Sequence, residues 1–299
     1  MHVVIGGSSG FLGTHLAREL ESRGHRITRL VRRSASAADE SRWDPASGEV
    51  DRSVIEAADV VVNLAGAPTA GNPHSQRWAD ELRESRVQST STLAAAIAGG
   101  ERKPAFLAGN GISVYGDHGS EQLREDGDHR GDALLRQVSE VWEAAAQPAA
   151  DAGARLCVLR TAPVMDRRSQ PLRVLRHVFR FGLGGRLGDG RQHFPMISLR
   201  DWVGAVVFLA EHDDVSGPFN LCCPQTPTNA EFTQALGRAL GRPAVIPVPA
   251  FAIRVGAARM APELLGSINA VPQALLDAGY EFRDHDVTAV LAAGLAQAS

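Results

Sequence analysis

The chain has 299 residues, 44% of them hydrophobic, and a formal net charge of −3. This length allows one large core or two modest ones, no apolar run approaches the ~20 residues that span a bilayer, and the charge does not favour nucleic acid as a partner. No membrane partner is expected, and no leader segment is visible before the first predicted strand at His2. Cys222 and Cys223 are adjacent, which suits neither a disulfide framework nor a metal site. We therefore expect a reduced, cytoplasmic protein without a metal.

Short apolar segments alternate with amphipathic helical patterns in the first half of the chain. The segments are rich in β-branched residues or leucine, as strands buried on both faces should be, and each helical pattern ends near a glycine or a turn. This alternation predicts an α/β fold with a doubly wound parallel sheet of the Rossmann type. The predicted strands are 2–5, 26–31, 60–64, 105–108 and 156–159, and the predicted helices are 11–23, 75–99 and 132–152.

The pattern changes after Pro163, and residues 181–195 are too rich in glycine to form one long regular element. We expect a dinucleotide-binding core over 1–166, to which 196–224 returns. A smaller C-terminal substrate lobe with its lid is expected over 167–195 and 225–299. In this half, 219–224 and 244–249 are predicted strands, and 231–240 and 251–260 are predicted helices.

A glycine cluster, Gly7-x-x-Gly10-x-x-Gly13, follows the first predicted strand and opens the first predicted helix. A pyrophosphate group needs backbone N–H groups at a helix N-terminus with no Cβ in its way. The spacing and its context therefore predict a dinucleotide site, whereas a tight turn without a ligand is the alternative. The residues expected to contact the cofactor here are Gly7, Ser8, Ser9, Gly10, Phe11, Leu12 and Gly13.

The end of the second predicted strand indicates which dinucleotide is bound. An acidic residue there would accept a hydrogen bond from the ribose 2′-hydroxyl of NAD. The sequence instead has Arg32 and Arg33, whose guanidinium groups suit a 2′-phosphate. We therefore expect NADP(H) rather than NAD(H), with two solvated loop charges as the alternative.

The third predicted strand ends in an apolar and glycine-containing segment. If the sheet is wound as proposed, Asn63, Leu64, Ala65 and Gly66 lie beside the adenosine and the diphosphate. Ordinary packing at the end of a strand is the alternative.

An ordered set of motifs resembles a known family. GGSSGFLG, VRR, WDP, VVNLAGAP, SR, VYGD and WEAAA, followed later by GLGGRLGDGRQHFP and VPQALLDAGYEFR, are similar to the atypical extended short-chain dehydrogenase/reductase family, whose members are often labelled NAD-dependent or nucleoside-diphosphate-sugar epimerases. The resemblance covers essentially the whole chain and implies an NADP-binding Rossmann core with a small substrate lobe. It also implies that Glu81 and Arg86 help to hold the cofactor, and that Pro163 and Val164 pack on its nicotinamide end. Surface charge and plain strand-to-loop packing are the alternatives.

The sequence departs from the family in its catalytic residues. Short-chain dehydrogenases typically use a serine with a Tyr-x-x-x-Lys pair, in which the lysine lowers the pKa of the tyrosine. That pair cannot exist here, because the only lysine is Lys103 and the only tyrosines are Tyr115 and Tyr280. The positions of the pair fall on Leu134 and Val138.

Three polar residues remain as catalytic candidates. Asn110 occupies the serine position, Tyr115 is the nearest phenol, and His193 lies in the glycine-rich segment. Structural packing is the alternative for each of them. We expect an NADP(H)-binding oxidoreductase or epimerase-like enzyme with an atypical active site and a small-molecule substrate. A non-catalytic dinucleotide-binding sensor or scaffold, or a non-redox enzyme on the same fold, is the alternative.

Overall fold

The computed structural model describes residues 1–296, which form two compact units. Unit 1 comprises 1–110, 138–159 and 203–218, and unit 2 comprises 111–137, 160–202 and the described residues from 219 onward. These bounds differ from the predicted division at residue 166, because the segment 111–137 belongs to unit 2.

An eight-stranded, mostly parallel sheet runs in the order β11-β8-β6-β5-β1-β2-β3-β4. Strand β1 pairs in parallel with β2 and β5, and β4 is antiparallel to β3. The doubly wound sheet is thus confirmed, and its order reverses at β1 and β5, beyond whose carboxyl ends such sheets bind ligands. The strands are β1 (His2–Gly6), β2 (Arg26–Val31), β3 (Glu40–Asp44), β4 (Glu49–Val50), β5 (Val60–Asn63), β6 (Ala105–Gly111), β8 (Leu156–Thr161) and β11 (Gly217–Leu221).

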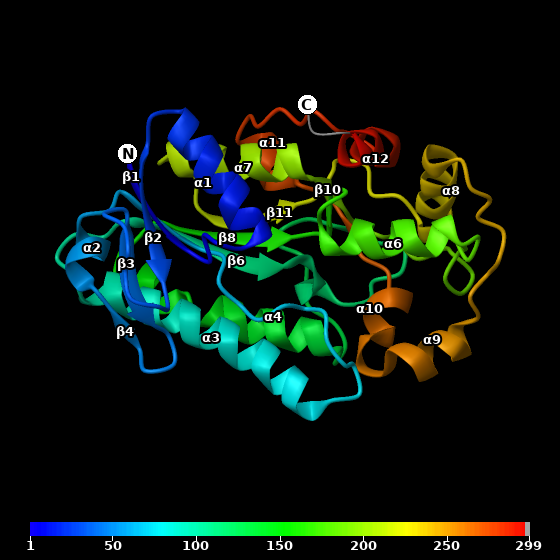
Figure 1. Cartoon of the computed structure of the whole chain (residues 1–299), viewed down its shortest axis with the longest axis horizontal. Helices are drawn as coiled ribbons and strands as arrows, with labels where there is room; N and C mark the ends of the chain where they lie inside the picture. The colour runs from blue at the N-terminus through cyan, green and yellow to red at the C-terminus, as the bar shows by residue number, and fades with distance from the viewer. Residues whose placement is uncertain (297–299) are drawn as a thin grey trace. The chain divides into compact units, whose positions relative to one another are not determined.

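Helices cover both faces of this sheet (Figure 1), with α1 (Phe11–Ser22) on one face and α3 (Gln76–Gly99) on the other. In α1 the buried residues Leu16, Ala17 and Leu20 form one stripe, which is the spacing of an amphipathic helix. On the other face, Leu93 and Ile97 of α3 belong to a core that also contains residues of β1, β5 and β6. The remaining helices around the sheet are α2 (Arg52–Glu56), α4 (Leu134–Ala144), α5 (Gln147–Asp151) and α7 (Leu199–Glu211).

Unit 2 has a core of its own, in which α6 (Gln170–Arg180), α8 (Asn229–Leu240) and α12 (Val287–Leu295) meet. Phe179, Phe232 and Leu291 are among its buried members. No helix within residues 1–296 combines the length and the apolar character that crossing a membrane requires. The other elements are η1 (Ile112–Tyr115), β7 (Gln122–Leu123), β9 (Val164–Met165), β10 (Ile197–Ser198), α9 (Ala250–Ala257), η2 (Ala258–Met260), α10 (Ala261–Leu265), β12 (Asn269–Ala270) and α11 (Gln273–Asp277).

Two predicted elements are wrong, and proline explains both. The helix expected over 132–152 is divided into α4 and α5, because Pro148 stands in the first turn of α5 and lacks an amide proton. The strand expected over 244–249 does not form, and Val248 makes only an isolated bridge to Leu187. Pro247 and Pro249 remove two donors that a strand ladder would need. Strands β3 and β4 were not predicted, since charged residues interrupt their apolar alternation.

Candidate functional site

The turn between β1 and α1 contains three glycines, and the structural constraint on a side chain differs between the three positions. Gly7 has a φ of +80°, and a Cβ there would lie 2.7 Å from the backbone nitrogen of Ala65. A Cβ on Gly13 would lie 2.3 Å from the oxygen of Gly7. Gly10 is exposed, has an ordinary φ of −71°, and a Cβ there would meet only the Gly7 oxygen at 3.2 Å. The fold therefore requires the first and third glycines, whereas at the second a Cβ would press on one atom, the Gly7 oxygen.

The N-terminus of α1 can receive an anion. Gly10 is its N-cap, no side chain caps the helix, and its first turn has no acidic residue. Uncapped N–H groups and the positive end of the helix dipole favour a negatively charged group at this position. Thr14 steadies the turn, because its hydroxyl donates to the oxygen of Ser8 at 3.2 Å. Ser9 beside Gly10 is exposed. The turn thus has the backbone donors that a diphosphate needs, and it is exposed at Ser9 and Gly10.

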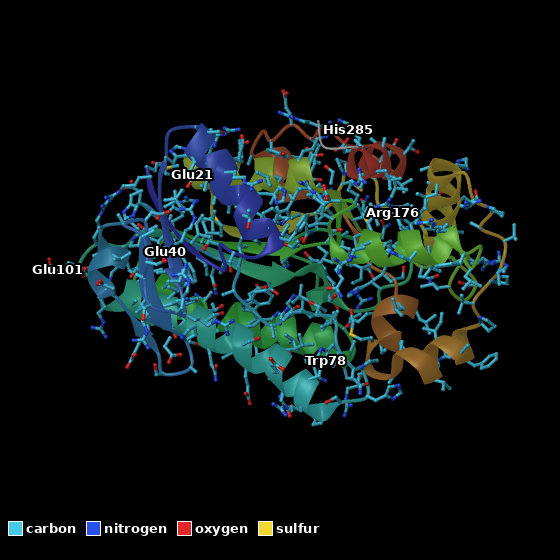
Figure 2. All side chains as sticks on the ribbon, in the orientation of Figure 1. Glu21, Glu40, Trp78, Glu101, Arg176 and His285 are labelled. Carbon is cyan, nitrogen blue, oxygen red and sulfur yellow. The ribbon has the colours of Figure 1, made fainter. Side chains whose placement is uncertain are left out.

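The two arginines after β2 have different surroundings. Arg33 donates from Nη1 to Glu40 Oε2 at 2.8 Å, and this guanidinium lowers the pKa of Glu40 to about 2. Glu40 opens β3 and is labelled in Figure 2. Arg32 is exposed, and the residues that the structure describes offer it no hydrogen-bond or ion-pair partner. Of the predicted pair, Arg32 is therefore the one whose charge is free for a ligand.

Asn63, at the end of β5, has an internal role. Its amide donates to the hydroxyls of Ser89 at 3.2 Å and Thr90 at 2.9 Å, and its carbonyl oxygen accepts from the backbone of Ala65 at 3.1 Å. These bonds hold the segment after β5 against α3. Leu64 and Ala65 are half-buried and Gly66 is exposed. The backbone of this segment adjoins the glycine turn, since the Leu64 amide donates to the oxygen of Gly6 at 2.8 Å.

Arg86 on α3 is a largely desolvated cation, and burial lowers its pKa to about 10. Its guanidinium donates to the Leu82 oxygen at 3.0 Å and the Thr69 hydroxyl at 3.4 Å, and its Cζ lies 5.1 Å from the centre of the Trp142 ring. In the described part of the chain it has no carboxylate partner. A buried cation normally has a counter-ion, so this geometry leaves a position for an anion. Glu81, one turn earlier, is exposed.

Asn110 is buried at the end of β6. Its amide donates to the Ser139 oxygen and to Glu143 Oε2, both at 3.1 Å, which ties β6 to α4. An amide held in this way supports the strand and is poorly placed to hydrogen-bond a substrate as well.

The surroundings of Tyr115 differ from those expected of a proton donor. It is fully buried, its hydroxyl donates to Asn220 Oδ1 at 2.8 Å, and it accepts from Arg160 Nη1 at 2.9 Å. Burial raises the pKa of Tyr115 to about 12. Because both hydrogen-bonding directions of the phenol are used inside unit 2, these contacts give Tyr115 a structural role, and its catalytic role stays a prediction. Arg160 and its contact to the Glu125 oxygen at 2.8 Å were not found from the sequence.

His193 remains the most available of the three catalytic candidates. It is half-buried, its backbone amide donates to Ser267 Oγ at 2.9 Å, and its ring Nδ1 lies 3.4 Å from the same oxygen. Pro163 is half-buried, and Val164 is buried as the first residue of β9, which pairs with β10. All three residues belong to unit 2, whereas the glycine turn, Arg32 and Arg86 belong to unit 1.

The only lysine has a structural position. Lys103 precedes β6, and its Nζ donates to the carbonyl oxygens of Ile97, Ala98 and Gly100 at 3.2, 2.6 and 2.6 Å. These oxygens lie at the end of α3, where a cation also interacts favourably with the helix dipole. Lys103 therefore caps α3.

The chain belongs to the NAD dependent epimerase/dehydratase family, which it matches over residues 3–222. Residues 248–293 match a domain of unknown function, DUF1731. An epimerase family protein of Mycobacterium leprae is 39% identical over 95% of this chain and 92% of its own length. The bovine epimerase family protein SDR39U1 is 35% identical, with 97% of this chain and 98% of that protein covered.

Solved structures agree with this assignment. A crystal structure of human epimerase family protein SDR39U1 with NADPH has a TM-score of 0.86 and 32% identity, covering 97% of this chain and 98% of its own. A nucleoside-diphosphate sugar epimerase from Corynebacterium glutamicum has a TM-score of 0.81 and 30% identity, covering 99% of this chain and 58% of its own. The resemblance to an atypical extended short-chain dehydrogenase/reductase is thus confirmed.

Proposed function

We propose that this protein binds NADP(H) through unit 1 and acts as an oxidoreductase or epimerase-like enzyme with an atypical active site. The observation that carries the proposal is Gly10: it is the exposed N-cap of α1 with an ordinary φ of −71°, no side chain caps this helix, and a side chain at this position would stand at the N-terminus where a diphosphate would bind. The human relative whose structure was solved with NADPH supports the choice of cofactor.

Three parts of unit 1 would each make a different interaction with the cofactor. The α1 N-terminus binds the diphosphate through backbone N–H groups, and Arg32 binds the 2′-phosphate. Arg86 supplies a second cation, held in place by Leu82, Thr69 and the Trp142 ring. When bound, the nicotinamide would supply hydride chemistry. The chain's own contribution is to bind and orient the cofactor.

Proton transfer would need a group other than a Tyr/Lys pair. Tyr115 is buried with both hydrogen-bonding directions used, and Lys103 caps α3. His193 is half-buried, whereas the other two candidates, Asn110 and Tyr115, are buried. Histidine is the side chain that most often serves as a general acid or base, so we assign it the proton-transfer role.

A second function follows from the same observations. Because two of the three candidate catalytic side chains have internal structural roles, a dinucleotide-binding sensor or scaffold without turnover is the alternative. Turnover separates the two. An NADPH-consuming reaction with small carbonyl compounds, abolished in Gly10→Val, indicates an enzyme, whereas tight NADPH binding without turnover across such a panel indicates a sensor.

Cofactor binding itself is tested by calorimetry on Gly10→Val. The backbone at Gly10 is extended and suits valine, so the circular dichroism spectrum should not change while NADPH binding is lost. A folded Gly10→Val protein that binds NADPH normally would overturn the proposal.

A further inference from the structure

Large exposed apolar side chains gather in unit 2. The described residues include twelve such side chains, and eight of them lie on α6, on α9 and in the segments that follow α6 and precede α9. Exposed apolar side chains that gather in this way are typical of an interaction site. The eight are Val174, Val178, Phe181, Leu183, Val245, Ile246, Phe251 and Val255.

The two stretches that carry these side chains are joined by backbone contacts. Leu187 bridges Val248, and the Gly188 amide donates to the Val248 oxygen at 2.9 Å. The Val248 amide in turn donates to the oxygen of Arg186 at 2.9 Å. The segment that follows α6 and the segment that precedes α9 are therefore held side by side, each with exposed apolar side chains.

The same stretches are strongly basic. Residues 170–188 and 241–257, which comprise α6, α9 and the two segments, contain six arginines and no aspartate or glutamate, in a chain whose net charge is −3. Arg176 on α6 is labelled in Figure 2. Five exposed arginines have no ion-pair partner among the described residues, and together with the eight apolar side chains they define the apolar-basic surface: Arg173, Arg180, Arg186, Arg242 and Arg254.

Helices α6 and α9 each have one buried apolar face and further apolar side chains on the exposed face, as helices that bind a membrane interface do. On α6, Leu172 and Phe179 face the core, while Val174 and Val178 are one turn apart on the exposed side. On α9, Ile253 is buried while Phe251 and Val255 are one turn apart and exposed. Apolar side chains flanked by arginine bind the boundary between headgroups and acyl chains.

We propose that the apolar-basic surface docks this protein onto an anionic phospholipid bilayer. The arginines match the negative charge of the lipid surface. Phe181, Val245, Phe251 and Val255 are each at least 70% exposed, so they protrude rather than form the floor of a groove. Protruding apolar groups enter a fluid interface directly, whereas a protein partner must offer a matching hole for each one.

A second copy of the chain fits this surface less well, because two arginine-rich surfaces would repel each other. The expectation of no membrane partner was based on the absence of a spanning segment. Interfacial docking needs no such segment. The proposal therefore replaces that expectation, and it does not depend on the proposed cofactor or reaction.

The test is co-sedimentation of the full-length protein with lipid vesicles, without nucleotide. Vesicles of phosphatidylcholine alone are compared with vesicles containing about 30 mol% phosphatidylglycerol. We expect binding to the anionic vesicles to be at least tenfold stronger and to weaken as salt rises from about 0.05 to 0.5 M. Equal, weak binding to both kinds of vesicle would overturn the proposal.

Two variants locate the binding surface. Phe181→Ser with Phe251→Ser removes two protruding rings, and Val141→Ser with Leu276→Ser is its control, since those side chains are exposed elsewhere. The first variant should lose at least fivefold in binding and the control should not. If the two bind alike, the apolar side chains are not involved and the proposal fails.

A charge-reversal pair completes the design. Arg180→Glu with Arg254→Glu should abolish binding, whereas Arg26→Glu with Arg42→Glu makes the same charge change at exposed sites on β2 and β3. Circular dichroism checks the fold of every variant. Size-exclusion chromatography addresses self-association: a dimer that dissociates in the Phe181→Ser, Phe251→Ser protein would assign the surface to a second copy and contradict lipid docking.

Discussion

The guanidinium of Arg86 lies over the indole of Trp142, with Cζ 5.1 Å from the ring centre. The indole is fixed in turn, because its Nε1 donates to the Thr90 hydroxyl at 2.8 Å, and that hydroxyl also accepts from Asn63. A chain of contacts thus connects the end of β5, helix α3 and helix α4 to one cation. Cation–π contacts of desolvated arginines are worth about 2 kcal/mol, so the position of Arg86 is well defined before any anion binds.

Removing this cation should weaken cofactor binding with little loss of structure. We predict that Arg86→Met loses at least tenfold in NADPH affinity, about 1.4 kcal/mol, because a charge-assisted contact to the cofactor is lost. Arg83→Met is the matched control, since Arg83 is an exposed arginine on the same helix. Calorimetry measures both. Equal affinities in the two variants would show that Arg86 only packs on Trp142.

The pKa of Arg86 adds a pH dependence. Burial lowers this pKa to about 10 from 12.5, so the charged form persists at neutral pH and is lost as the pH rises through about 10. Binding of an anion favours the charged form. The contribution of Arg86 to NADPH affinity should therefore be constant between pH 7 and 8.5, and the affinity of the wild type should begin to fall toward pH 10. A titration of affinity against pH that is unchanged by Arg86→Met would contradict this assignment.

The two tyrosines should be silent in a spectrophotometric titration of the folded protein. Burial raises the pKa of Tyr115 to about 12 and, with the neighbouring Asp201, raises that of Tyr280 as well. The folded state therefore favours the neutral phenols, and stability falls as the pH rises above about 10, where the unfolded chain releases these protons. Absorbance near 295 nm should show almost no ionisation at pH 10 in the native protein, whereas in urea each tyrosine should be about half ionised at that pH.

Tyr115→Phe provides the complementary measurement. It leaves Asn220 and Arg160 without their shared partner, which should cost ~1–3 kcal/mol of unfolding free energy. NADPH affinity should stay within twofold. If the variant instead keeps full stability but loses turnover a hundredfold, Tyr115 is the proton donor after all and its structural assignment is wrong.

Lys103→Met should lower the stability of the fold without weakening NADPH binding. Its ammonium holds three carbonyl oxygens at the end of α3, so its loss should cost ~1 kcal/mol of unfolding free energy. NADPH affinity should remain within threefold. Urea denaturation and calorimetry measure the two quantities, and a Lys103→Met protein of unchanged stability that cannot bind NADPH would refute the cap.

The sequence was most informative where local pattern decides structure. Strand β2 has the predicted bounds, because four of its six residues are β-branched or leucine, which favours a strand. The glycine turn was also predictable, because the local spacing of three glycines between a strand and a helix is enough to indicate it. The strand expected over 244–249 does not form. The apolar pattern of this segment favours a strand, but Pro247 and Pro249 each lack the backbone N–H that a strand donates to its neighbour.

The candidate site was less predictable, because its electrostatics depend on distant pairing. Arg32 and Arg33 look equivalent in the sequence, and only the pairing of β2 with β3 brings Glu40 to Arg33. Tyr115 looked accessible beyond its strand, but Arg160 and Asn220 come from other segments to enclose it. No local pattern reports such contacts.

The central claim, that unit 1 is an NADP(H) site in which Arg32 reads the 2′-phosphate, is tested most directly by calorimetric titration of the wild type and of Arg32→Ala with NADPH and NADH. Arg33→Ala is the control, because the charge of Arg33 is already matched by Glu40. We predict that the wild type binds NADPH at least tenfold tighter than NADH, about 1.4 kcal/mol, and that Arg32→Ala loses most of this preference while Arg33→Ala keeps it. Equal affinities of the wild type for the two nucleotides, or an undiminished preference in Arg32→Ala, would contradict the account.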